Sequence, residues 1–301
     1  MALKLRDWAG PEDTHAIQRL ATKLWPRGLH PGGLGWAAAR GRLAEHLVLA
    51  EGDGVVGWAG VSQPGELVAQ VDPGSPRAAR NLVEWLLAAA NGPELTIEVA
   101  HGDRVLSDAL LAAGFLSCPN RGVGVGMRHP AVDRPPSIGG GYRVRNVEPG
   151  ELADRVEVHR AAWKPALLPW HPDHRPVTDP EATSPFTRGH YDAVRRTWLY
   201  DPRLDLVVVA PDGSLVACCI AWFDPATGCA EIEPLGVVPE HRRRGLAGLL
   251  CLEVAARVAR AGGREVFINT GPRPDYPAPY GAYTKAGFEV VSRTSPYRLV
   301  R

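Results

Sequence analysis

The chain has 301 residues, about twice the usual length of one domain, which predicts two compact domains. Its hydrophobic fraction of 45% and charged fraction of 22% are ordinary for a globular protein, and a formal net charge of +1 removes the general electrostatic argument for nucleic acid binding. The N-terminus carries Lys4, Arg6 and Asp7 and no long apolar run, so we expect neither a signal peptide nor a membrane span, and a cytoplasmic location.

The first half of the chain shows the pattern of a strand, a hairpin and a later helix. A strand is predicted at 3–8, and the apolar runs at 46–50 and 55–61 flank Glu-Gly-Asp-Gly, which predicts a hairpin. This half closes on Ala-Gly-Phe at 113–115. The stretch that follows, 129–141, is rich in proline and glycine and cannot sustain a helix or an inner strand, so we predict a linker there.

The second half repeats the same order. It again opens on a strand, and apolar runs at 204–210 and 214–223 flank Pro-Asp-Gly. A further strand is predicted at 229–238, an amphipathic helix at 246–261 and a buried strand at 265–269. Because Ala-Gly-Phe recurs at 286–288, we infer a tandem duplication.

The five cysteines are odd in number and lack the spacing of a zinc site or a disulfide framework. Cys218, Cys219 and Cys251 fall in apolar runs without a supporting histidine pattern, so we expect no nucleophilic cysteine. All five are expected to be reduced and mostly buried.

A run of three arginines joins the predicted strand at 229–238 to the helix that follows it. The first turn of a helix leaves N–H groups unpaired and carries partial positive charge, so this junction suits a diphosphate. The alternative is a solvated arginine cluster that caps an ordinary helix; the order strand, basic glycine loop, helix, strand favours the anion site. The residues of the predicted site are Arg242, Arg243, Arg244, Gly245, Leu246, Ala247 and Gly248.

This junction also resembles a known signature. The pattern Arg242-x-x-Gly245-x-Ala247, following Leu-Gly-Val-Val at 235–238, resembles the acetyl-CoA motif of the GNAT N-acetyltransferase superfamily. Downstream, Tyr283-x-x-x-Gly-Phe resembles the close of that fold, and Asn269 ends the preceding strand where the family often has asparagine, so the resemblance implies Asn269 as a cofactor-binding residue. The resemblance covers about residues 143–301.

The resemblance implies a splayed strand whose backbone at Leu235, Val237 and Val238 pairs with the pantetheine arm of acetyl-CoA, the co-substrate. It also implies that residues 242–248 hold the pyrophosphate and that Tyr283 donates a proton to the departing thiolate. A core aromatic role is the alternative for Tyr283.

A carboxylate must take the proton of the attacking amine, because an ammonium ion has no lone pair. Glu231 and Glu233 are two apart in a strand, so we expect them on one face and treat both as candidates for the base. The alternative is that they orient a cationic substrate or pair with arginines.

The acceptor pocket is predicted around Trp163, Trp170 and His171, which combine flat apolar surface with hydrogen-bonding groups. A purely structural loop is the alternative. His171 and His174 have the spacing of metal ligands, but no third ligand is indicated, so we expect no metal. The insertion at 271–280 is expected near the same cleft.

The first half lacks the arginine and glycine pattern. It has Asp-Pro-Gly-Ser-Pro-Arg at 72–77, and Leu110 stands where the second half has Tyr283. We therefore predict a non-catalytic GNAT-like domain at 1–128, the linker at 129–141 and a catalytic GNAT domain at 142–301. Each is expected to be an α/β (α+β) domain, with a mixed, mostly antiparallel sheet flanked by helices. A tandem of this kind resembles mycothiol synthase in architecture.

The hypothesis drawn from these patterns is acetyl transfer to a primary amine of a small molecule, by direct attack in a ternary complex. The alternative from another class is a non-catalytic CoA-binding sensor or interaction module. We expect no nucleic acid or membrane partner and a monomer or homodimer. The excess of arginine over lysine is associated with a bacterial source.

Overall fold

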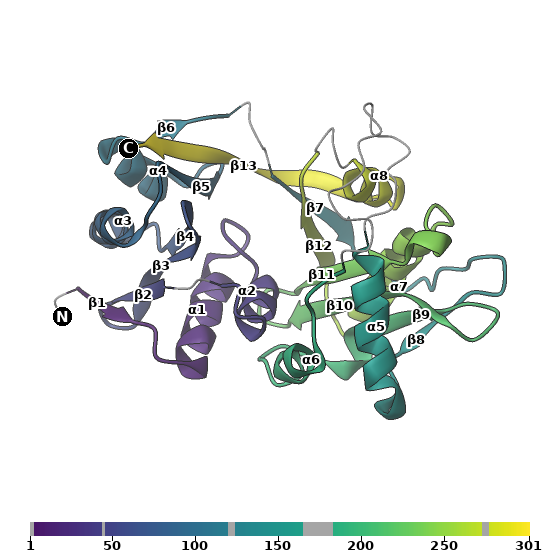
Figure 1. Ribbon diagram of the computed structural model, residues 1–301. Coiled ribbons are helices and arrows are strands. Elements are labelled where there is room, and N and C mark those ends of the chain that lie inside the picture. Colours follow the sequence, from purple (N-terminus) through teal and green to yellow (C-terminus); the bar gives the residue numbers. More distant parts are fainter. Residues whose placement is uncertain (1–2, 44–45, 120–123, 165–182, 273–276) are drawn as a thin grey trace. The chain divides into compact units, whose positions relative to one another are not determined.

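The computed structural model describes residues 3–43, 46–119, 124–164, 183–272 and 277–301 (Figure 1). The chain forms two compact units. The first unit comprises residues 1–125 together with 292–301, and the second comprises 126–291. The predicted α/β class with mostly antiparallel sheets flanked by helices is confirmed.

In the first unit the strands run in the order β1-β2-β3-β4-β5-β13, and β6 also pairs with β13. Among the strand pairs formed by described residues of this unit, only β4–β5 is parallel. The elements are β1 (Lys4–Asp7), α1 (Pro11–Leu24), α2 (Pro31–Ala39), β2 (His46–Glu51), β3 (Val55–Gln63), β4 (Glu66–Val71), α3 (Pro76–Ala89), β5 (Glu94–Ala100), α4 (Arg104–Ala112), β6 (Leu116–Ser117) and β13 (Glu289–Val300).

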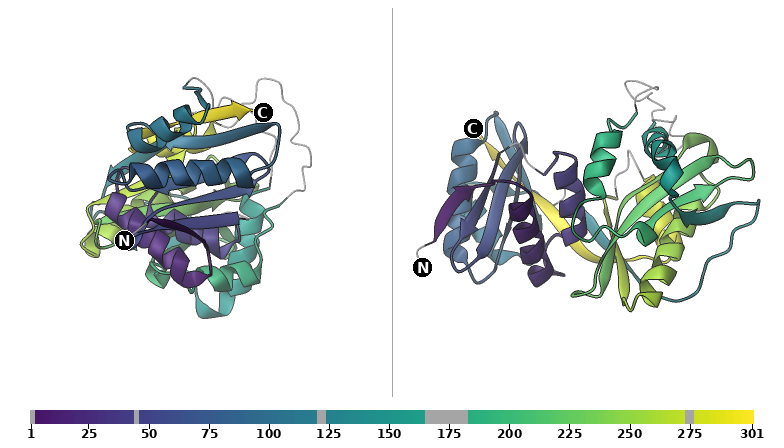
Figure 2. Two further views of the ribbon diagram at one scale, coloured as in Figure 1. Left: turned by 90° about the vertical axis from the view of Figure 1, so that its left-hand side faces the viewer. Right: turned by 90° about the horizontal axis from the view of Figure 1, so that it is seen from below.

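Helices cover both faces of this sheet (Figure 2). Neighbouring residues of β2 show why, because Val48 packs in the larger core with Leu82 of α3, whereas Leu49 packs in the smaller core with Ile17 of α1. Alternation along a strand sends successive side chains to opposite faces.

In the second unit the strands run in the order β7-β12-β11-β10-β9-β8. The predicted helix at 246–261 and strand at 265–269 are confirmed as α7 and β12. The elements are β7 (Val125–Pro130), β8 (Arg143–Asn146), η1 (Pro149–Glu151), α5 (Leu152–Ala162), α6 (Arg188–Val194), η2 (Pro202–Leu204), β9 (Asp205–Val209), β10 (Leu215–Asp224), β11 (Cys229–Val237), η3 (Pro239–His241), α7 (Leu246–Arg260), β12 (Glu265–Thr270) and α8 (Ala278–Lys285).

The unit boundaries differ from the predicted domain boundaries at two places. Residues 292–301 group with the first unit, because β13 pairs along β5 from Thr294 to Val300. Residues 129 and 130 belong to β7, so the segment without regular strand or helix starts at 131. The linker itself is as irregular as its prolines predict.

A buried ionic cluster holds α5 and α6 on the sheet of the second unit. Arg155 of α5 has no exposed surface, and its Nε donates to Asp205 of β9 at 2.9 Å. The hydroxyl groups of Tyr191 and Tyr200 donate to the other Asp205 oxygen at 2.7 and 3.0 Å. Burial, together with this carboxylate, raises the pKa of both tyrosines, so their hydroxyl groups stay protonated donors.

Candidate functional site

The strands β11 and β12 part at the centre of the second unit's sheet. They pair in parallel at three positions, which end with Glu231 opposite Phe267. Beyond that point β11 continues to Val237 and β12 to Thr270 without further pairing between them. The parting exposes one edge of β11, and a strand edge offers backbone N–H and C=O groups to a ligand.

A bulge interrupts β11 inside this parted segment. Ile232 lies opposite Ala221 of β10 and Leu235 lies opposite Cys219, so three steps on β11 match two on β10. Glu233 and Pro234 together lie opposite the single residue Ile220, so β11 has one extra residue here, and the proline has no N–H for the ladder. Because the two-residue alternation breaks here, it no longer places Glu233 on the face of Glu231.

Glu231 lies on the α5 side of the sheet. Its partner across the ladder is Trp222, which shares a face of β10 with Cys218, the cysteine beside Arg155 of α5. Glu231 is only 2% exposed, and Asn269 of β12 donates to its Oε1 at 2.8 Å. The two predicted residues thus meet at the point where the strands part.

The backbone of β11 alternates between its neighbour β10 and the open edge. The N–H of Val238 donates to Val216 in the β10 segment at 3.0 Å, so the Val238 amide is not available to a ligand. Alternation then directs the backbone groups of Val237 and Leu235 to the open edge. The Arg242 Nε donates to the Val237 carbonyl at 3.1 Å. The Val237 N–H and the N–H and C=O groups of Leu235 therefore face the gap.

The loop before α7 presents a row of amides. Among the described residues, no acceptor pairs with the N–H groups from Arg243 to Gly248, and the first helical bond runs from the Leu249 N–H to the Gly245 carbonyl at 2.9 Å. Arg243 and Gly245 have φ of 61° and 83°, in the left-handed region. Gly245 adopts this conformation without strain, and backbone of this type forms anion-binding concavities.

The three arginines of the loop are not equivalent. Arg243 and Arg244 are exposed and have no ion pair within the described part of the chain. Arg242 is half-buried, and its Nη2 donates to the carbonyls of Ala162 and Lys164 at 3.0 and 2.9 Å. Its guanidinium therefore donates its hydrogen bonds to backbone carbonyls of the protein.

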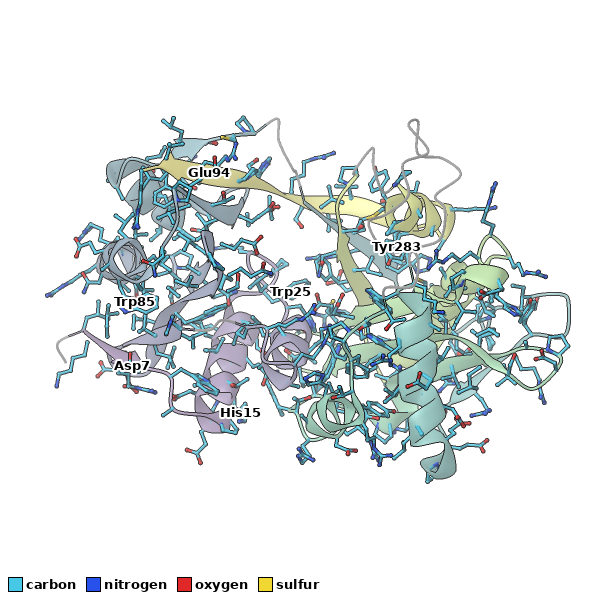
Figure 3. The ribbon with its side chains drawn as sticks, in the orientation of Figure 1. Asp7, His15, Trp25, Trp85, Glu94 and Tyr283 are labelled. Carbon is cyan, nitrogen blue, oxygen red and sulfur yellow. The ribbon has the colours of Figure 1, made fainter. Side chains whose placement is uncertain are left out.

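Tyr283 lies in α8 and is 8% exposed (Figure 3). Its ring centroid is 6.3 Å from that of Phe288. The helix packs against α7. A Cβ added to Gly248 of α7 would lie 3.7 Å from the Cβ of Ala286, which caps α8, and this is an ordinary van der Waals distance. Gly248 thus faces α8, while Ala247 is half-buried in the same first turn.

Trp163, at the end of α5, is the one predicted acceptor residue within the described part of the chain. It is 43% exposed and stacks on His159 with centroids 4.3 Å apart. Its ring covers Gly236 so closely that a Cβ there would lie 2.5 Å from Cζ3. Trp170 and His171 lie outside the described residues.

Three further expectations concern metals, membrane spans and cysteines. In the described part of the chain, no three His, Cys, Asp or Glu side chains gather as metal ligands. No helix among the same residues is long and apolar enough to cross a bilayer. All five cysteines are free, and four are buried, as predicted. Burial raises the pKa of the Cys218 and Cys219 thiols, and that of Cys251 to about 12, so these thiols stay protonated.

The comparable loop of the first unit is filled by its own side chains. The β4–β5 pairing also ends after two positions, but the Asp72 carboxylate accepts from the Gly74 N–H at 2.9 Å and from Lys23 Nζ at 2.6 Å. A carboxylate therefore stands just before α3, where the second unit presents free amides. The sequence reasoning missed this contact, although the Asp-Pro-Gly-Ser stretch is typical of a side-chain-capped turn.

The first unit also contains a cavity of about 580 Å³ at its surface. Its lining includes Asp7, Trp8, His46 and Trp85, two of which are labelled in Figure 3. Trp85 is near the C-terminal end of α3, whereas Asp72 precedes the N-terminal end, so this cavity is not the counterpart of the α7 loop.

Comparisons with known proteins concern the family of the second unit and the fold of the chain. The family model described as "Acetyltransferase (GNAT) family" matches residues 167–288, which is less than half of the chain. No curated protein matches. Solved structures share the fold over nearly the whole chain.

Three such structures are a GNAT acetyltransferase from Colwellia psychrerythraea, a tandem GNAT protein from the clavulanic acid pathway and a GCN5-related N-acetyltransferase from Sphaerobacter thermophilus. The first has a TM-score of 0.63 at 15% identity, over 98% of this chain and 99% of the other. The second has 0.61 at 15%, over 99% and 98%. The third has 0.58 at 22%, over 99% and 95%. At these identities the likeness shows the fold.

Proposed function

We propose that this chain belongs to the GNAT acetyltransferase family, whose model matches residues 167–288, and that its second unit transfers an acetyl group from acetyl-CoA to a primary amine of a small molecule. The observation that carries the proposal is the row of unpaired amides from Arg243 to Gly248 beside the open edge of β11. The first unit is proposed to be non-catalytic, because Asp72 occupies the comparable turn.

The residues present fit acetyl-CoA at two places. A diphosphate is suited to the amides of residues 243–248 and to the exposed guanidinium groups of Arg243 and Arg244. The pantetheine arm contains amides and is suited to the free backbone groups of Leu235 and Val237, in the manner of an added strand. We revise the predicted contacts at two residues: the Val238 amide and the Arg242 side chain serve the protein itself.

The chemistry needs one group that takes a proton and one that gives a proton. We propose that Glu231 receives the amine proton, directly or through a water molecule, because Asn269 orients this carboxylate where the strands part. Tyr283, on the α7 side of the sheet, is proposed to donate its phenolic proton to the departing thiolate sulfur. A gap between two strands is open to both faces, so residues from opposite faces can serve one reacting carbon.

The attack is proposed to be direct. The amine nitrogen forms the new bond to the thioester carbon, the C–S bond breaks, and the thiolate leaves as CoA. Burial keeps Cys218, Cys219 and Cys251 protonated, so no thiolate among them is ready to form an acyl-enzyme. The exposed part of Trp163 is proposed as one wall of the acceptor site.

The test is amine-dependent release of CoA. The intact protein is mixed with acetyl-CoA and a panel of small primary amines, and free thiol is measured with a disulfide reagent. We expect release above the amine-free rate with at least one class of amine, and loss of that release in an Arg243→Ala/Arg244→Ala variant. Acetyl-CoA binding without release across a broad panel would favour the sensor hypothesis.

A further inference from the structure

The Arg242 guanidinium joins two segments far apart in the sequence. Its Nε donates to the Val237 carbonyl at 3.1 Å, and its Nη2 donates to the carbonyls of Ala162 and Lys164. The last two residues flank Trp163, the C-terminal cap of α5. The C-terminal end of a helix leaves carbonyl groups unpaired and carries partial negative charge. A guanidinium stabilises it both by donating hydrogen bonds to these carbonyls and by its positive charge.

Ring contacts also hold Trp163 against β11. Its ring stacks on His159, and Gly236 leaves no room between ring and strand, because a Cβ there would also lie 2.7 Å from the Ala162 Cβ. The indole therefore lies directly on β11, next to Val237. The same guanidinium fixes the backbone of Trp163 and the strand on which the indole lies.

We propose that Arg242 is a positioning residue that couples the acceptor wall at Trp163 to the cofactor strand β11, rather than a phosphate ligand. The proposal rests on the proposed function for its ligands, and it goes beyond that function by linking the two binding sites. Occupation of the open edge at Leu235 and Val237 restrains Val237, and the guanidinium passes this restraint to Ala162 and Lys164. The acceptor wall is thus ordered when the cofactor strand is occupied.

Lysine is the informative replacement, because it keeps the positive charge but has one compact ammonium in place of a planar fork. The test is hydrogen exchange of the peptide 159–164, measured by mass spectrometry with and without acetyl-CoA, together with titration calorimetry. In the free protein we expect Arg242→Lys to raise exchange in 159–164 by at least about threefold, since charge-assisted bonds to carbonyls are lost. Exchange in α7 should stay unchanged, which reports that the unit is folded.

With acetyl-CoA we expect added protection of 159–164 in the unaltered protein and loss of this added protection in Arg242→Lys. The acetyl-CoA Kd of Arg242→Lys should change less than about threefold, whereas the control Arg244→Ala should weaken binding about tenfold and keep the protection at saturation. Arg242→Gln is the second variant if the lysine protein unfolds.

The inference is overturned if exchange in 159–164 of free Arg242→Lys equals that of the unaltered protein, or if Arg242→Lys loses as much acetyl-CoA affinity as Arg244→Ala. The measurement on free protein needs no ligand. If the unaltered protein binds no acetyl-CoA, the proposed function fails and the coupling fails with it. If acetyl-CoA binds and turns over but 159–164 does not respond, the coupling alone fails.

Discussion

Asn269 of β12 donates a hydrogen bond of 2.8 Å to Glu231 of β11, across the point where these strands part. The bond fixes the carboxylate of a side chain that is only 2% exposed. A base must be held in place to take a proton from an incoming amine, so we propose Glu231 as the stronger of the two candidates for the base.

The first prediction separates these two carboxylates. Glu231→Gln is expected to lower kcat about 100-fold, because the amide cannot accept the proton, while its size and its hydrogen bond to Asn269 are kept. Glu233→Gln is the matched control, with a loss below about tenfold, since Glu233 lies in the bulge. Steady-state kinetics with an accepted amine measure both. The reverse order of effects would assign the base to Glu233.

The second prediction concerns the proton donor. Tyr283→Phe is expected to lower kcat about 100-fold while the acetyl-CoA Kd changes less than about threefold, because only the hydroxyl is removed from a buried ring. Phe288→Leu is the control for packing in the same cluster. Equal losses of turnover and of acetyl-CoA affinity in Tyr283→Phe would indicate a purely structural tyrosine.

The third prediction is a binding stoichiometry of one acetyl-CoA per chain. Asp72 and Lys23 fill the turn before α3, and an added diphosphate would meet the repulsion of the Asp72 carboxylate. Equilibrium dialysis with labelled acetyl-CoA gives the number of sites. A value near two would show that the first unit also takes the co-substrate.

The fourth prediction concerns stability and pH. Arg6, through two side-chain hydrogen bonds of 2.7 Å, holds the pKa of Asp13 below its ordinary value of 3.8. Because the folded-state pKa is the lower one, this stabilisation is present above pH 3.8 and is lost as the pH falls through the folded value. Arg6 is 35% exposed, so we expect Asp13→Asn to lower the free energy of unfolding by only about 1 kcal/mol at pH 7.

Urea unfolding at pH 7 and at pH 3 checks this expectation. Glu12→Gln is the control, since its exposed side chain precedes Asp13 in α1. The difference between Asp13→Asn and the unaltered protein should shrink at the lower pH. A difference that stays constant would mean that the loss comes from packing.

The sequence predicted the elements with strong periodicity, notably α7 and β12, and the position of the basic loop. It did not predict that β13 pairs with β5, because the pattern of a strand specifies its faces but not its neighbour. Pro234 did signal the bulge in β11, since proline lacks the N–H of a ladder residue. The expectation that Glu231 and Glu233 share a face ignored that signal.

Arg242 shows a different limit. The motif marks a basic loop, but the carbonyls that bind this guanidinium belong to Ala162 and Lys164, some 80 residues earlier in the chain. Gly236 was visible as a glycine inside a strand, which indicates close approach of another group, here Trp163. The architectural resemblance to mycothiol synthase and the roles of Trp170 and His171 stay predictions.

The most direct test of the account is titration calorimetry of the intact protein with acetyl-CoA. We predict saturable binding that weakens about 10- to 100-fold in Arg243→Ala/Arg244→Ala. Each exposed guanidinium is expected to add a charge-assisted contact with the diphosphate to the hydrogen bonds that the amides of residues 243–248 donate to it. Absence of binding, or binding with unchanged affinity in that variant, would contradict a diphosphate site at the start of α7.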